Sequence, residues 1–110
     1  MPYDPRYLTF FDCFNRQQYF EAHEVLEGLW LETRDDRRDF YKGLIQTAAV
    51  FLKLQQGKPD AATRLARRAR TLLLRYEPRC EGLDVSTILE RLDAVLAGEM
   101  PATTLELPCD

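Results

Sequence analysis

The sequence has few of the residues from which disulfide frameworks, metal clusters and membrane spans are built. Of its 110 residues only three are cysteines, at positions 13, 80 and 109, and only one is a histidine. An odd number of widely spaced cysteines without a CxxC pair indicates a reducing compartment, so we expect a cytoplasmic protein. The longest apolar runs, such as Leu72–Leu74, are far too short to cross a bilayer. The opening residues also lack the pattern of a secretory signal.

Glycine-rich phosphate loops and nucleophile motifs are missing too, and no run alternates apolar and polar residues with β-branched side chains. The absence of glycine-rich loops excludes the common nucleotide-binding loops, and the absence of alternating runs predicts that the fold has no sheet. What is present is an ordinary globular composition, 45% hydrophobic and 30% charged. This length fits a single domain, residues 1–110, with one core.

Apolar residues recur with helical spacing in five stretches. They predict an all-α fold, a compact bundle of about five antiparallel helices, over residues 5–14, 17–33, 37–56, 59–76 and 84–97. Asp4 and Asp84 are the expected N-caps, and the first helix is expected to bury Leu8 and Phe11. The third helix is apolar on more than one side, which predicts a central position. The tail 99–110 contains two prolines and is expected to be irregular.

The stretch Tyr19–Trp30, YFEAHEVLEGLW, places a histidine and a glutamate in the middle of a helical apolar stripe. His23 and Glu27 are four residues apart, so they lie one above the other on the same helix face. The apolar residues that flank this pair are Tyr19, Phe20, Leu26, Trp30 and Leu31. A charged or polar pair at such a position must be hydrogen-bonded or must bind something. We therefore expect a buried site at this pair.

Segments 14–31, FNRQQYFEAHEVLEGLWL, and 40–57, FYKGLIQTAAVFLKLQQG, resemble the DUF309 family of bacterial and archaeal proteins. The hallmark of that family is a His-x3-Glu-x2-(Trp/Tyr) motif, present here as His23, Glu27 and Trp30. The resemblance covers the first three helices and extends more loosely through the fourth. It implies an all-helical fold and no established biochemical activity, and the motif has been suggested to bind a metal.

Three interpretations of the pair remain open. In the first, His23 and Glu27 belong to a structural hydrogen-bond network that fixes how the helices pack. In the second, they bind a divalent metal, because imidazole nitrogen and carboxylate oxygen are both good ligands. In the third, a glutamate-oriented imidazole moves protons without a metal. Glu24 is expected at the rim of this pocket, and Trp30 is expected in the core, where its indole N–H can close the polar network. Gln46 and Gln55 are the uncharged polar groups that the third helix offers.

Ligand number is the difficulty for the metal interpretation. His23 is the single histidine, whereas catalytic zinc takes about three protein ligands and structural zinc four. A ligand set rich in carboxylates would favour manganese, iron or magnesium. Any further ligand must come from a second subunit or from one of Glu24, Asp12, Asp39 and Cys13.

The fourth helix carries an excess of positive charge. Segment 59–76 has five arginines against Asp60, a formal charge of +4, which leaves −7 for the rest of a chain whose total is −3. The residues expected on this basic face are Arg64, Arg67, Arg68 and Arg75. Charge asymmetry can mark a phosphate-binding surface. Because no base-reading motif accompanies the arginines, pairing with acidic residues is favoured and nucleic acid is not the expected partner.

The sequence thus predicts a small helical protein with a metal-binding His23–Glu27 pocket, for which hydrolysis is the candidate activity. The alternative is a non-enzymatic interaction module, or a nucleic-acid-binding module, in which the pair is structural and the arginine helix is the contact face. Helices that are apolar on more than one side are also compatible with a homodimer.

Overall fold

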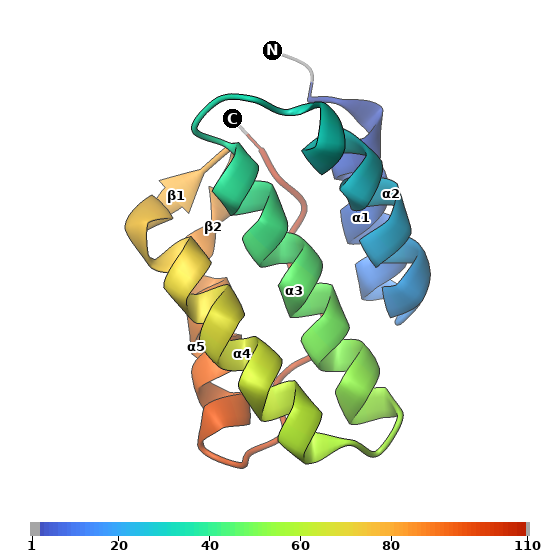
Figure 1. Ribbon diagram of the computed structural model, residues 1–110, viewed down its shortest axis with the longest axis vertical. Helices are drawn as coiled ribbons and strands as arrows, with labels where there is room; N and C mark the ends of the chain where they lie inside the picture. Colours follow the sequence, from blue (N-terminus) through green and yellow to red (C-terminus); the bar gives the residue numbers. More distant parts are fainter. Residues whose placement is uncertain (1–2, 110) are drawn as a thin grey trace.

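The computed structural model describes residues 3–109 and is mostly helical, as predicted (Figure 1). Each helix lies within three residues of its predicted bounds. The helices are α1 (Pro5–Asn15), α2 (Tyr19–Glu32), α3 (Arg38–Gln55), α4 (Pro59–Leu73) and α5 (Val85–Leu96). A short 3₁₀ turn, Leu74–Tyr76, extends α4. Within residues 3–109, none of the helices combines the length and hydropathy that a bilayer span requires.

Two aspartates begin helices as the sequence predicts. The Asp4 carboxylate accepts a hydrogen bond of 2.8 Å from the backbone N–H of Arg6, and Pro5 occupies the first helical position. The Asp84 carboxylate accepts one of 3.2 Å from the backbone N–H of Thr87. Each bond satisfies a donor that the helix itself leaves free, which fixes where α1 and α5 start.

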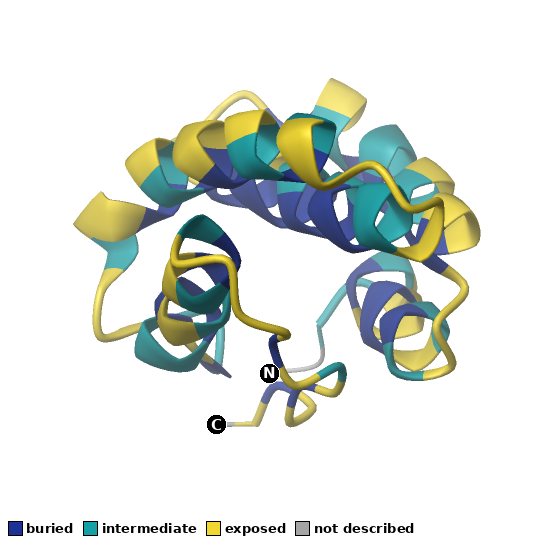
Figure 2. Cartoon of the chain, turned by 90° about the horizontal axis from the view of Figure 1, so that it is seen from below, coloured by how far each residue is buried: buried dark blue, intermediate teal, exposed yellow. Residues whose placement is uncertain are grey.

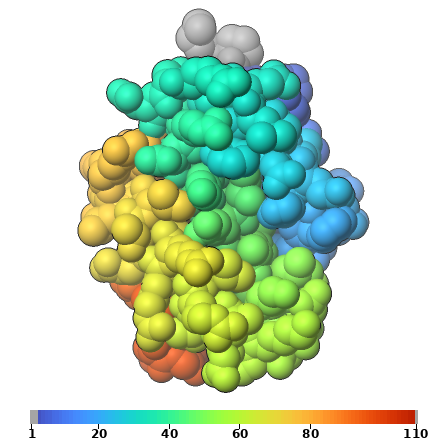
Figure 3. All heavy atoms as spheres, in the orientation of Figure 1, coloured from blue at the N-terminus to red at the C-terminus, as the bar shows by residue number. Residues whose placement is uncertain are grey.

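The helices form two layers. Helices α2, α3 and α4 lie side by side in one layer, and α1 and α5 lie beneath it (Figure 2). Helix α3 is buried on most of its circumference, which confirms its predicted central position. Its more open stripe consists of Lys42, Gln46, Ala49 and Lys53, which are spaced by three or four residues. This stripe belongs to the outer face of the three-helix layer, the face turned to the viewer in Figure 3.

The prediction of no sheet is wrong. Strands β1 (Arg79–Cys80) and β2 (Leu83–Asp84) form a small antiparallel hairpin, with Cys80 opposite Leu83. Its two-residue turn is Glu81–Gly82, and both residues have positive φ, +49° and +70°. Such turns match the twist of the strands they join. Glutamate rarely adopts this conformation, so the turn carries no recognisable sequence signal.

The predicted buried side of α1 is also partly wrong. Leu8 is 37% exposed, whereas Phe11 is buried as expected, together with Tyr7 and Phe10. The ring of Tyr7 packs edge-on against Phe11, with centroids 5.2 Å apart, and lies 5.8 Å from the ring of Tyr41 in α3. Aromatic pairs of this kind add to ordinary apolar burial. They turn the face that carries Tyr7 toward the core and leave Leu8 at the surface.

Residues 99–109 contain no helix or strand and run between α1 and α5 (Figure 2). The side chain of Asn15 holds this tail by two hydrogen bonds. Its amide donates to the carbonyl of Leu105 at 2.9 Å, and its oxygen accepts from the N–H of Leu105 at 2.8 Å. Pro101, Leu105 and Pro108 are buried. The tail therefore closes the side of the core that faces away from the three-helix layer.

Candidate functional site

The family motif lies at the border of the buried face of α2, and its predicted place in the middle of that face is wrong. The buried residues of this helix are Tyr19, Ala22, Leu26 and Leu29. On a helix wheel, His23 is roughly 80° and Glu27 roughly 120° from the centre of that set. The His23 side chain is 33% exposed and that of Glu27 is 47% exposed. The site is therefore half-open to solvent, and the expected burial of the pair is corrected.

His23 and Glu27 do face each other across one helical turn. The distance from His23 Nε2 to Glu27 Oε2 is 3.6 Å, which is longer than a hydrogen bond but within ion-pair range when the imidazole is protonated. The other ring nitrogen, Nδ1, is buried and has no partner among the described residues. The ring of Phe20 stacks on the imidazole, with centroids 6.3 Å apart and an interplanar angle of 20°. The pair is thus held on one face of α2.

The structure does not assemble a metal-ligand set around this pair. Across residues 3–109, no group of three or more His, Cys, Asp and Glu side chains could hold a metal ion. Of the further ligands considered from the sequence, Asp39 instead lies 3.4 Å from Arg75. Burial raises the pKa of the Cys13 thiol, which disfavours the thiolate that a metal would need. Two adjacent ligands fall short of the three that catalytic zinc uses.

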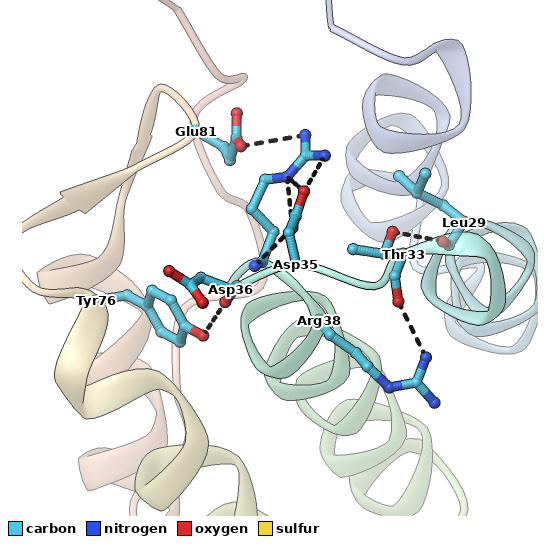
Figure 4. Close-up of polar contacts among 8 residues, drawn as sticks. Leu29, Thr33, Asp35, Asp36, Arg38, Tyr76 and Glu81 are labelled. Carbon is cyan, nitrogen blue, oxygen red and sulfur yellow. Dashed lines mark hydrogen bonds and ion pairs between the residues drawn. The ribbon is translucent and has the colours of Figure 1, made fainter.

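Trp30, the third residue of the motif, is covered by two cations from α3. The Arg38 guanidinium carbon lies 4.4 Å from the Trp30 ring centre, and Lys42 Nζ lies 5.6 Å from it. Both distances fall within the range of cation–π attraction. Arg38 also donates to the carbonyls of Trp30 and Thr33 at 3.1 Å each, and Figure 4 shows it reaching back to Thr33. These contacts join the end of α2 to the start of α3.

Gln46 lies one turn beyond Lys42 on α3. The side-chain carbonyl oxygen of Gln46, Oε1, is buried and has no hydrogen-bond partner in the described part of the chain. The same holds for Nδ1 of His23 and Nε1 of Trp30. Buried polar atoms without partners are rare in folded proteins. Two helical turns are about seven residues. Two turns from Trp30 lead back to His23 on α2, and two turns from the α3 residues that cover Trp30 lead to about residue 47. The three atoms belong to the adjoining helices α2 and α3, and we refer to the border between these helices as the polar seam.

An open groove lies on the other side of this stripe, between α3 and α4. Its volume is about 370 Å³, and it is lined by Lys42, Gln46, Arg67, Arg68, Thr71 and Leu72. Three of these side chains are cationic and none is a carboxylate. Figure 3 shows the surrounding face, on which atoms of α3 lie between those of α2 and α4. Lys42 contacts the family motif on one side and lines the basic groove on the other, so the two candidate sites meet at this lysine.

The arginines of the fourth helix fall into two groups. Arg70 Nε lies 2.8 Å from an Asp93 carboxylate oxygen on α5, and Arg75 pairs with Asp39. The Arg75 guanidinium also donates to the Tyr76 hydroxyl at 2.6 Å, and this bond raises the pKa of Arg75 above its ordinary value. The second group is Arg64, Arg67 and Arg68. The side chains of these three arginines make no ion pair and no hydrogen bond with residues 3–109.

The sequence allowed these arginines to pair with acidic residues of the same or of a neighbouring subunit. Within residues 3–109 such a pair is present for Arg75 and absent for Arg64, Arg67 and Arg68. Sequence reasoning missed Arg38, Lys42 and Thr71 as site residues. The usable signal was the spacing of Lys42 and Gln46, four residues apart on the polar stripe of a helix that is otherwise apolar. Glu24 is exposed on α2, and no described contact joins it to the motif.

Fold and surface together define a small helical protein with a half-open polar seam and a basic groove on one face. Residues 7–65 match the family described as "Domain of unknown function (DUF309)", so the chain belongs to this family. The match covers α1 to α3 and the start of α4, which includes the whole motif.

One relative is an uncharacterised protein from Aquifex aeolicus (strain VF5), 25% identical over 85 residues. The alignment covers 76% of this chain but only 26% of the relative. The chain thus spans about a quarter of the length of the relative it matches. No solved structure matches the chain significantly.

Proposed function

We propose that this protein is a binding module that holds the phosphate groups of a nucleic acid against the outer face of α3 and α4. The observation that carries the proposal is the state of Arg64, Arg67 and Arg68, which have no carboxylate partner among residues 3–109 although Arg70 on the same helix has one. An arginine already engaged in an ion pair must break it to bind an anion. In the part of the chain that the structure describes, these three arginines have no ion pair to break.

The spacing of these side chains supports the same proposal. Arg64, Arg67, Arg68 and Thr71 follow the i, i+3, i+4, i+7 pattern and share one side of α4 over about 10 Å. Lys42 adds a cation from the neighbouring helix. Nucleic acids present phosphates at short, regular intervals, and arginine matches their oxygens with two parallel N–H groups. Overall acidity of the chain does not prevent such binding, because contact depends on the local charge.

The comparison with the longer relative supports a module rather than a self-sufficient enzyme. In that protein the matched part makes up 26% of the chain, so the helical unit is joined to a much larger remainder. A unit used in this way is suited to binding or positioning something for another domain.

A divalent metal on His23 and Glu27 is the first function predicted from the sequence, and the binding module proposed above is its alternative. The pair supplies two ligands, and the described residues supply no third. We therefore assign no hydrolytic step to it. Metal analysis of the protein purified without chelators tests this directly. Metal that is present in the wild type and lost in His23→Ala, with folding retained, would restore the metal interpretation.

The binding proposal is tested by fluorescence anisotropy with labelled single-stranded RNA and DNA at about 50 and 200 mM salt. Affinity should fall steeply as salt rises, because bound counterions are released when phosphates are neutralised. The double variant Arg67→Ala/Arg68→Ala should bind at least tenfold more weakly, and its affinity should depend less on salt. Arg70→Ala is the matched control on the same helix, and it should bind almost as the wild type does.

Two results would overturn the proposal. One is the absence of salt-dependent binding to any of these strands. The other is a loss of binding free energy in Arg70→Ala that reaches half the loss in the double variant, since the double variant removes two charges and net charge alone would give that ratio. Gel filtration of the same samples tests the homodimer predicted from the sequence and ensures that affinities are compared at one oligomeric state.

A further inference from the structure

The groove between α3 and α4 differs from a general basic surface because cations from two helices line the same hollow. Lys42 approaches from α3, and Arg67 and Arg68 approach from α4. From this geometry we infer that the groove seats a phosphomonoester, the terminal phosphate of a nucleotide or of a nucleic-acid strand. The inference rests on the proposed function and specifies which part of the ligand enters this groove.

Charge and oxygen count favour a monoester over a phosphodiester. A phosphomonoester carries between −1.5 and −2 charges near neutral pH and three strong acceptor oxygens. A diester carries a single negative charge and two free oxygens. The groove offers three cationic side chains and no carboxylate, so each oxygen of a monoester can meet its own cation.

Lys42 is held in position by the family motif. Its ammonium lies 5.6 Å from the ring centre of Trp30, and Arg38 covers the same ring at 4.4 Å. Arg38 is fixed in turn by hydrogen bonds to the carbonyls of Trp30 and Thr33. A lysine that is already ordered loses less conformational entropy when it binds an anion. The motif tryptophan thus acts as a positioning residue for the groove.

The walls of the groove are close together because α3 and α4 approach closely at Gly43. A Cβ atom added to Gly43 would lie only 2.6 Å from Cγ and Cδ2 of Leu73. The apolar side chain of Leu72 lines the groove, and an apolar surface strengthens the attraction between the cations and a bound anion.

The two neutral polar residues of the groove have different roles. The Thr71 hydroxyl donates to the carbonyl of Arg67 at 3.0 Å, so it can only accept a further hydrogen bond. Gln46 has a buried carbonyl oxygen, while its amide nitrogen makes no hydrogen bond with residues 3–109. The amide N–H group of Gln46 is therefore the neutral donor available to a phosphate oxygen.

The first experiment compares one oligonucleotide with and without a 5′-phosphate. We expect the phosphorylated strand to bind about tenfold more tightly, equivalent to 1.4 kcal/mol. Lys42→Ala should remove this preference, whereas Lys42→Arg should keep it. Arg64→Ala is the control, since Arg64 lies on α4 outside the groove, and it should weaken both strands equally. Circular dichroism confirms that each variant is folded.

The second experiment uses adenosine 5′-monophosphate and its 3′,5′-cyclic form as competitors for the labelled strand. The cyclic form has the same base and sugar, but its phosphate is a diester. Displacement by the monoester alone supports the inference, and equal displacement by both compounds overturns it. If the monophosphate competes while a 5′-phosphate on the strand has no effect, the ligand is the free nucleotide.

The two proposals fail in different ways. If the strands bind in a salt-dependent manner and the 5′-phosphate and the monophosphate both have no effect, the groove inference is wrong and the proposed function stands. If neither strand nor nucleotide binds, both are wrong. The role of Trp30 has its own readout, because Trp30→Leu and Lys42→Ala should be non-additive in a double-mutant cycle of binding. Additive losses would show that Trp30 does not act through Lys42.

Discussion

The close contact between α3 and α4 predicts opposite effects of the same substitution at two glycines inside helices. Gly43→Ala adds a methyl group 2.6 Å from two side-chain carbons of Leu73, which is itself fully buried. Gly28→Ala on α2 adds a methyl group whose closest neighbour is Arg6 Nη1, at 3.8 Å. The first position has no room for the added carbon, and the second accommodates it at ordinary contact distance.

The expected changes in the free energy of unfolding follow from two terms, the helix propensity of alanine and the packing of the core. Alanine is favoured over glycine within a helix by about 1 kcal/mol at either position. Gly28→Ala should therefore stabilise the protein by about 0.5–1 kcal/mol. At Gly43 the overpacking of the core costs about 1–3 kcal/mol, which offsets or exceeds that gain. The gain in helix propensity is the same in both variants. The difference between their free energies of unfolding is therefore the packing cost at Gly43, about 1–3 kcal/mol.

Thermal and urea unfolding followed by circular dichroism measure this difference. If the free energies of unfolding of the two variants differ by about 1–3 kcal/mol, their Tm values differ by at least about 4 °C for a chain of this size. Equal Tm values for Gly28→Ala and Gly43→Ala would refute the close approach of α3 and α4. Gly43→Ala should also weaken the binding of a phosphomonoester, because it separates the two walls of the groove.

Three further outcomes follow from single contacts. Asn15→Ala should cost about 1–3 kcal/mol and speed proteolysis near Leu105, because it leaves that buried backbone without its two hydrogen bonds; unchanged proteolysis would contradict this. Burial raises the pKa of Cys80 to about 11, so roughly one in a thousand of these thiols is ionised at pH 8. Mass spectrometry should therefore show that the exposed Cys109 is alkylated before Cys80. Burial also raises the pKa of Tyr7 above that of the unfolded chain, so stability should be full below about pH 10 and fall above it. Tyr7→Phe should make that alkaline fall less steep, and an identical pH profile would count against it.

The helices could be predicted because each is encoded locally. Aspartate caps and apolar spacing need no knowledge of the rest of the chain, and both are visible at Asp4 and Asp84. The buried side of a helix is a different matter, because it depends on which neighbours the helix packs against. The apolar pattern of α2 predicted that His23 lies in the middle of the buried side. The neighbouring helices instead bury the side that carries Ala22 and Leu26.

The candidate site was predicted in parts and not as a unit. The motif and the arginine helix were both visible in the sequence, but as alternatives. Their connection runs through Lys42, which is ordinary in sequence and becomes informative only when α3 is placed between α2 and α4. The small hairpin was missed for a related reason, since its turn is imposed on Glu81 by the fold.

The hairpin turn is also where the two ends of the described chain meet. The Cβ that Gly82 lacks would collide with the Tyr3 side chain and the Cys109 carbonyl, and the Cys109 N–H donates to the Gly82 carbonyl at 3.0 Å. Both ends thus emerge on the side away from the three-helix layer (Figures 1 and 2). A domain fused at either end would leave from the back of the molecule and would not cover the groove between α3 and α4.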